Sequence, residues 1–216
     1  MLLINLFLIL TFLTNELLYW VIYLKTKDSG KSKNWDTYTN LYFILRTITI
    51  ILFPILNSSF FVEFNGQISY FREYWIWFLI LGIIIIIVGI KLIKSTLNVN
   101  KYKGFKKGDY QLITEGPYEI MRHPMYSFWA LIFLSLAFIF DSFISLILSP
   151  FVMLFLGFEG FLEEKYILIP KFGEKYENYI EKTSHRLFPS PYNALLVIIA
   201  IFVVYIGILN INYILI

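Results

Sequence analysis

The residues best suited to chemistry in this chain form two short polar blocks separated by an apolar stretch. The first block contains Arg122, His123 and Pro124, and the second is the adjacent pair Glu163 and Glu164. Pro124 disfavours helix at the residue before it and favours a helix that starts there, so free backbone N–H groups would lie beside a guanidinium and an imidazole. Such an arrangement can bind an anion or a carboxylate.

Each block also has a simpler interpretation that involves no ligand. An arginine beside the membrane can anchor to lipid phosphates, a histidine can cap a helix, and Glu163 and Glu164 can be the first polar turn of a helix that leaves the membrane. Tyr110, Tyr118 and Tyr126 recur at intervals of eight residues. They suit the aromatic belt of a membrane interface as well as stacking on a purine or facing a cation. The combination of these features is what favours a functional site.

The rest of the chain is dominated by apolar residues. Hydrophobic residues make up 58% and charged residues 15% of the sequence, whereas a soluble domain of this length carries about 25% charged residues. This composition indicates an integral membrane protein whose first partner is the lipid bilayer. Cysteine is absent and there are two histidines, which excludes disulfides and a cysteine nucleophile and argues against a metal centre. We expect no metal and no nucleic-acid partner.

Apolar runs long enough to cross a bilayer, roughly 20 residues each, organise the chain. We expect an all-α, polytopic membrane bundle of about five to six transmembrane helices. The first run lacks the basic region and cleavage site of a signal peptide, so we expect it to be retained. Two runs of only about 24 Å barely cross, and Asp141 and Ser142 should form the turn of the hairpin between them. The expected spans are 2–24, 41–62, 74–97, 125–140, 143–158 and 194–214.

Lysine and arginine predict the orientation of these spans. Basic residues follow the first run, the third run and the hairpin, whereas the opposite loops hold only Arg72. The positive-inside rule places the basic side in the cytoplasm. Because a hairpin returns to the side from which it started, both polar blocks should meet at the cytoplasmic face. Glu16 and Arg46 lie deeper, where they either pair or extend separately toward the interfaces, and we expect neither to be catalytic. Residues 159–183 should form a cytoplasmic helical region that is broken near Pro170 and Gly173.

Taken together, the blocks resemble the isoprenylcysteine carboxyl methyltransferase family and, more distantly, the phospholipid methyltransferases. The resemblance covers roughly residues 95–190. It rests on the order and spacing of Gly116-Pro117-Tyr118, Arg122-His123-Pro124-Met125-Tyr126, Glu163-Glu164, Phe172-Gly173-Glu174-Lys175-Tyr176-Glu177-Asn178-Tyr179 and Arg186-Leu187-Phe188-Pro189.

The resemblance implies an S-adenosylmethionine-dependent methyltransferase with a cytoplasmic cofactor pocket and a lipophilic methyl acceptor. It implies catalytic roles for Arg122 and Glu164. The expected organisation is an N-terminal three-helix membrane region (1–97), a methyltransferase core (98–190) and a C-terminal transmembrane helix (191–216). The cofactor-binding residues carried over by position are Tyr110, Gln111, Leu112, Ile113, Tyr118, His123, Pro124, Met125, Tyr126 and Glu164.

One departure from the family pattern leaves the acceptor open. Gly160 stands where eukaryotic members carry an arginine associated with the acceptor, so both a prenylcysteine carboxylate and a lipid remain candidates. Two other functions also remain. The arrangement is similar to that of membrane sterol and steroid reductases, which use NADPH, although Met125 replaces their asparagine and no arginine cluster for a 2′-phosphate is evident. A non-enzymatic membrane scaffold is the third alternative.

Overall fold

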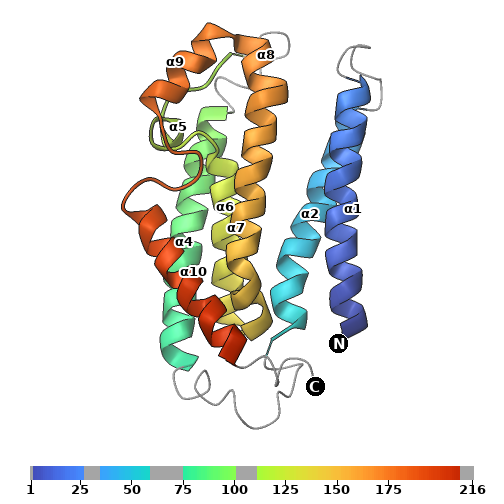
Figure 1. The fold of residues 1–216 in the computed structure, drawn as a ribbon, viewed down its shortest axis with the longest axis vertical. Helices are drawn as coiled ribbons and strands as arrows, with labels where there is room; N and C mark the ends of the chain where they lie inside the picture. Colours follow the sequence, from blue (N-terminus) through green and yellow to red (C-terminus); the bar gives the residue numbers. More distant parts are fainter. Residues whose placement is uncertain (1, 27–34, 59–74, 101–110, 210–216) are drawn as a thin grey trace.

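A computed structural model describes residues 2–26, 35–58, 75–100 and 111–209, and every regular element among these residues is a helix. Figure 1 shows long helices running alongside one another, with short helices gathered at one end. In chain order the elements are α1 (Leu2–Thr26), α2 (Trp35–Leu56), α4 (Trp75–Val99), α5 (Pro117–Ile120), α6 (Pro124–Ile139), α7 (Phe143–Glu163), the π-helical turn η2 (Glu164–Leu168), α8 (Ile169–Phe172), α9 (Glu174–Lys182) and α10 (Tyr192–Leu209).

Several of the described helices suit a membrane. By length and composition, Asn5–Ile22, Trp75–Val99 and Phe143–Phe172 can each cross one, and three shorter apolar helices accompany them: Leu41–Leu56, Pro124–Ile139 and Tyr192–Ile201. The predicted all-α membrane architecture is confirmed, and the number of about five to six spans stays a prediction. The expected span 143–158 was too short, because the helix continues through acidic residues whose side chains find partners inside the protein.

The predicted hairpin between α6 and α7 is confirmed. Asp141 adopts a φ of 48°, and the N–H of Ser142 donates to the carbonyl of Ala137 at 2.8 Å. The α6 helix also packs closely on α4. A Cβ at Gly82 would lie 2.9 Å from the carbonyl oxygen of Ser135, so this contact requires glycine, as is common where membrane helices approach closely.

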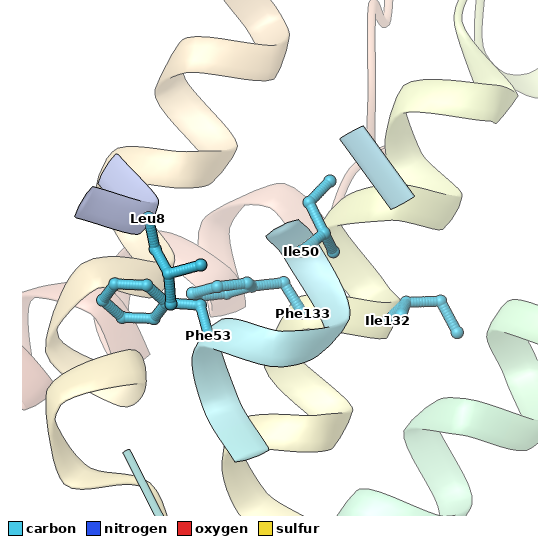
Figure 2. Close-up of a cluster of buried hydrophobic side chains, with 5 residues drawn as sticks. All are labelled: Leu8, Ile50, Phe53, Ile132 and Phe133. Atoms are coloured by element: carbon cyan, nitrogen blue, oxygen red, sulfur yellow. The ribbon is translucent and has the colours of Figure 1, made fainter. Parts of the chain in front are cut away.

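A buried apolar cluster attaches the α1–α2 pair to the rest of the bundle. Figure 2 shows its members on α1, α2 and α6, and the rings of Phe53 and Phe133 lie 6.2 Å apart. In Figure 1, α1 and α2 form one side of the molecule, beside α7. The cluster comprises Leu8, Ile50, Phe53, Ile132 and Phe133.

The short helices fold back over one end of the bundle. The expected break occurs at Gly173, which has a φ of 54°, whereas Pro170 lies in the first turn of α8, where a missing N–H is tolerated. On α9, the buried Tyr179 donates its hydroxyl to the carbonyl of Tyr118 at 2.6 Å. This bond holds α9 against α5, so the segment that follows α9 returns to the entrance of the hairpin.

Candidate active site

Backbone hydrogen bonds fix the entrance of the hairpin. The N–H of Arg122 donates to the carbonyl of His185 at 3.0 Å, and the N–H of His123 donates to that of Arg186 at 2.9 Å. The hydroxyl of Ser127 donates to the carbonyl of Leu187 at 3.0 Å. These bonds hold the segment 185–187 against residues 122–127, at the start of α6.

The carboxylate of Glu164 is the centre of the site. Its Oε1 accepts a bond from Arg122 Nε at 2.8 Å and lies 3.0 Å from His123 Nε2. Its Oε2 accepts bonds from Arg186 Nη2 at 2.8 Å and Arg186 Nε at 3.2 Å. The predicted meeting of the two polar blocks is confirmed. Charge-assisted bonds of this kind are about twice as strong as neutral ones, and three side chains use one carboxylate.

His123 lies between two carboxylates. Its Nδ1 is 3.3 Å from Glu163 Oε2, while its Nε2 faces Glu164. Burial of the ring lowers its pKa, but hydrogen bonds to Glu163 and Glu164 outweigh that effect and raise the pKa above its ordinary value. The imidazole therefore holds a proton more readily than a histidine in water. The Glu163 side chain is 32% exposed, so it is the more accessible of the two carboxylates.

Arg186 was not among the predicted site residues. It occupies the space in front of Gly160, where a Cβ would lie 3.0 Å from Arg186 Cδ and 3.1 Å from His123 Cδ2. Its guanidinium also lies over the ring of Phe161, with 5.6 Å between Cζ and the ring centroid. The signal that could have identified Arg186 is its place at the start of Arg186-Leu187-Phe188-Pro189, one of the motifs on which the resemblance rests.

Two further groups complete the surroundings of Arg122. Its Nη1 donates to the carbonyl of Thr183 at 2.6 Å. The ring of Tyr176 is buried, and its hydroxyl has no hydrogen-bond partner among the residues that the structure describes. Burial raises the pKa of Tyr176, so this hydroxyl stays protonated. It is an unused buried donor beside the charged cluster, and such groups usually have a partner.

The structure brings some of the other predicted residues to the site. Pro124 begins α6, as expected, and Met125 follows it half-buried. The Tyr118 hydroxyl donates to Asn100 Oδ1 at 3.1 Å, and burial raises the pKa of Tyr118. Three other predicted residues lie in the segment that leads to α5: Gln111, Leu112 and Ile113. Within the described residues, none of these three bonds to the Glu164 cluster. Tyr110 lies outside the described residues.

Tyr126 joins the site to a second charged cluster. Its ring lies 5.4 Å from the ring of His123 and 5.3 Å from Arg46 Cζ. Arg46 is fully buried and forms an ion pair with Glu159, and its Nε lies 3.6 Å from Glu16 Oε1. Of the two expectations for Glu16 and Arg46, pairing is confirmed.

One comparison with known proteins finds a similarity in the segment that holds the site. Residues 77–175, from α4 into α9, match the family model described as phospholipid methyltransferase. Comparisons with curated proteins and with solved structures found no match. The matched segment covers less than half of the chain and contains the hairpin and both polar blocks. The chain uses S-adenosyl-L-methionine as its methyl donor and acts on a lipid acceptor.

Proposed function

We propose that the cluster around Glu164 is the cofactor end of the active site and that the acceptor is the amine headgroup of a membrane phospholipid. The observation that carries this proposal is the engagement of Glu164 by Arg122, His123 and Arg186. These bonds bring cationic hydrogen-bond donors and a carboxylate acceptor together at the entrance of the hairpin. The proposal keeps the expected organisation of the chain into an N-terminal membrane region (1–97), a methyltransferase core (98–190) and a C-terminal transmembrane helix (191–216).

The residues present suit a zwitterionic cofactor with an aromatic base. Arg122, His123 and the first N–H groups of α6 suit its carboxylate, and the half-exposed Glu163 suits its ammonium group or ribose hydroxyls. The unused hydroxyl of Tyr176 adds one donor. When bound, the cofactor supplies an activated methyl group on a sulfonium. The rings of Tyr118 and Tyr126 would flank the adenine, with Tyr110, Gln111, Leu112, Ile113, Pro124 and Met125 as further walls.

Glu164 acts in this proposal by positioning its neighbours. Both of its oxygens already accept bonds from cationic side chains, so it fixes the directions in which Arg122, His123 and Arg186 point. Fixed donors of this kind lower the reorganisation needed during the reaction. Arg122, which bonds both Glu164 and the carbonyl of Thr183, is then held in one orientation toward the cofactor.

The charges of the cluster favour an amine over a carboxylate as the acceptor. In this proposal Arg122 serves Glu164 and the cofactor carboxylate, Arg186 is paired with Glu164, and Gly160 supplies no further cation for an acceptor carboxylate. An amine acceptor must lose a proton before its lone pair can attack, and His123 is not free to take that proton because its raised pKa keeps it protonated. Glu163 would first take the proton from the ammonium group, and the neutral amine would then form the new N–C bond as the C–S bond breaks.

The location of the basic segments supports a cytoplasmic site. In Figure 1 the ends of α1 and α4 that lead into lysine-rich segments point to the same end of the bundle as α5, α8 and α9. The positive-inside rule assigns that end to the cytoplasm, where the cofactor is available. A lipid acceptor would approach sideways from the bilayer.

The test is to follow labelled methyl groups from S-adenosylmethionine into lipids of membranes that contain the chain. We expect label in a phospholipid that survives mild base as an N-methyl group. Release of the label as methanol by base would instead identify a carboxyl methyl ester, as a prenylcysteine acceptor would give. Membranes that contain Glu164→Gln give the background level of label. Label in neither product above that background would refute methyl transfer to a lipid.

A further inference from the structure

An apolar cavity of about 240 Å³ lies between α1, α2, α6 and α7. Its lining includes Phe12, Phe53, Phe133, Val152 and Phe155. The one hydroxyl in the lining, that of Thr49, donates to the carbonyl oxygens of Leu45 and Arg46 at 2.9 and 3.0 Å. The cavity therefore offers a ligand only hydrocarbon contacts.

The outer wall of the cavity faces the surface of the bundle. Ile9, Leu13 and Phe151 line it and are 38%, 47% and 56% exposed. Ile9 and Leu13 lie in the membrane-crossing part of α1, and Phe151 lies in that of α7. Because the surroundings at this depth are lipid tails, a hydrocarbon chain is the occupant whose chemistry matches both the lining and the opening.

Three helices connect this cavity to the charged residues of the interior. Glu16 follows Phe12 by one turn on α1, and Glu159 follows Phe155 by one turn on α7, while Arg46 precedes Thr49 by about one turn on α2. One further turn of α7 reaches Glu163. The polar residues thus lie between the cavity and the site.

Acidic groups outnumber basic ones between the cavity and the site. Two carboxyl groups, those of Glu16 and Glu159, contact the single guanidinium of Arg46. The Oε1 atom of Glu16 is buried and accepts no hydrogen bond within the described residues. An unfilled acceptor among carboxyl groups suits a headgroup that brings hydrogen-bond donors, as an amine headgroup does.

We propose that this cavity holds one hydrocarbon chain of the acceptor lipid, whose headgroup passes Glu16, Arg46 and Glu159 toward His123 and Glu163. The inference rests on the proposed function and extends it to α1 and α2, which lie outside the matched segment 77–175. In this arrangement α1 and α2 form half of the lipid-binding site. The contact of Arg46 with Tyr126 then links the position of the lipid to that of His123.

The test uses a dioleoyl phosphatidylethanolamine analogue with a diazirine in one acyl chain. The probe is photolysed with the purified full chain in nanodiscs, and the labelled peptides are identified by mass spectrometry. Val152→Trp fills the cavity, and Val152→Phe fills it less severely. Leu154→Trp is the matched control, because Leu154 lies two residues away on the same helix and is 72% exposed. Titration with S-adenosylhomocysteine checks that each variant retains its cofactor site.

We expect labels on the cavity-lining parts of α1, α2 and α7. Val152→Trp should reduce them about tenfold, the effect of excluding roughly two buried methylene groups, and Leu154→Trp should not. Equal labelling in Val152→Trp and the unmodified chain, or labelling of the Leu154 face alone, would overturn the inference. These results do not depend on turnover. If the unmodified chain binds S-adenosylhomocysteine but the labels lie outside the cavity, this lipid site alone is refuted. If the unmodified chain does not bind S-adenosylhomocysteine, the proposed function is refuted.

Discussion

Arg186 occupies the space that a side chain at position 160 would need. A Cβ at Gly160 would lie 3.0 Å from Arg186 Cδ, and from this position Arg186 Nη2 reaches Glu164 Oε2 at 2.8 Å. The glycine and the arginine are therefore two parts of one arrangement. The space in front of Gly160 is filled by a cation from a different segment of the chain.

Gly160→Ala should weaken cofactor binding. The new methyl group would press on Arg186 and on the buried ring of His123, and overpacking of this kind costs about 1–3 kcal/mol. We expect S-adenosylhomocysteine to bind about tenfold more weakly, which corresponds to 1.4 kcal/mol. Calorimetric titration in detergent measures this change.

Gly157→Ala is the matched control for that variant. It lies on the same helix, and its Cβ would meet only Leu187 Cδ1, at an ordinary 3.6 Å. Both substitutions gain the same helix propensity, so the difference between them reports the steric effect. Equal affinities of the two variants would show that Arg186 does not need the space in front of position 160.

Arg122→Gln should destabilise the protein as well as impair the site. It removes the guanidinium that bonds Glu164 and the carbonyl of Thr183, and it leaves buried acceptors without their partner. Removing one member of a buried ion pair costs about 3–5 kcal/mol. The thermal midpoint in detergent should fall clearly, whereas Lys175→Gln on the exposed face of α9 should leave it unchanged. A midpoint equal to that of the unmodified chain would contradict the observed bonding.

The stability that His123 contributes should depend on pH. Its pKa is raised above the ordinary 6.5 in the folded protein, so the folded state binds the proton more tightly than the unfolded state does. This contribution is fully present below about pH 6.5 and is lost as the pH rises through the folded pKa. The difference in thermal midpoint between the unmodified chain and His123→Gln should therefore shrink as the pH rises. His185→Gln should retain the pH dependence, and a difference that grows with pH would contradict the assignment.

Arg46→Met should be among the most destabilising single substitutions. It would leave the carboxylates of Glu16 and Glu159 buried without the guanidinium between them, at a cost of about 3–5 kcal/mol. Adding Glu159→Gln should restore part of the loss, because one buried charge is removed. A double-mutant cycle of thermal midpoints checks this coupling, and simple additivity would show that the two residues act independently.

The sequence predicted the fold and the site best where local rules suffice. The turn at Asp141 and Ser142, the start of α6 at Pro124 and the break at Gly173 follow from residue conformational preferences. The meeting of Arg122 and Glu164 follows from hairpin topology alone.

The remainder depended on tertiary contacts that hydropathy does not encode. The expected span stopped at residue 158 because Glu159 and Glu164 interrupt the apolar run, although the fold supplies both with partners. The role of Arg186 depends on backbone bonds from the hairpin entrance to a segment about sixty residues later. The pairing of Arg46 with Glu159 joins α2 to α7, and no local pattern in either helix predicts it.

The most direct test of the account is calorimetric titration of the detergent-solubilised chain with S-adenosylhomocysteine and with NADPH. The unmodified chain should bind the homocysteine analogue and not NADPH. Glu164→Gln should lose most of that affinity, because Arg122, His123 and Arg186 lose their common partner, while Glu174→Gln on exposed α9 should bind as the unmodified chain does. Binding of NADPH alone would point to a reductase, and equal analogue affinity in both variants would contradict the central role assigned to Glu164.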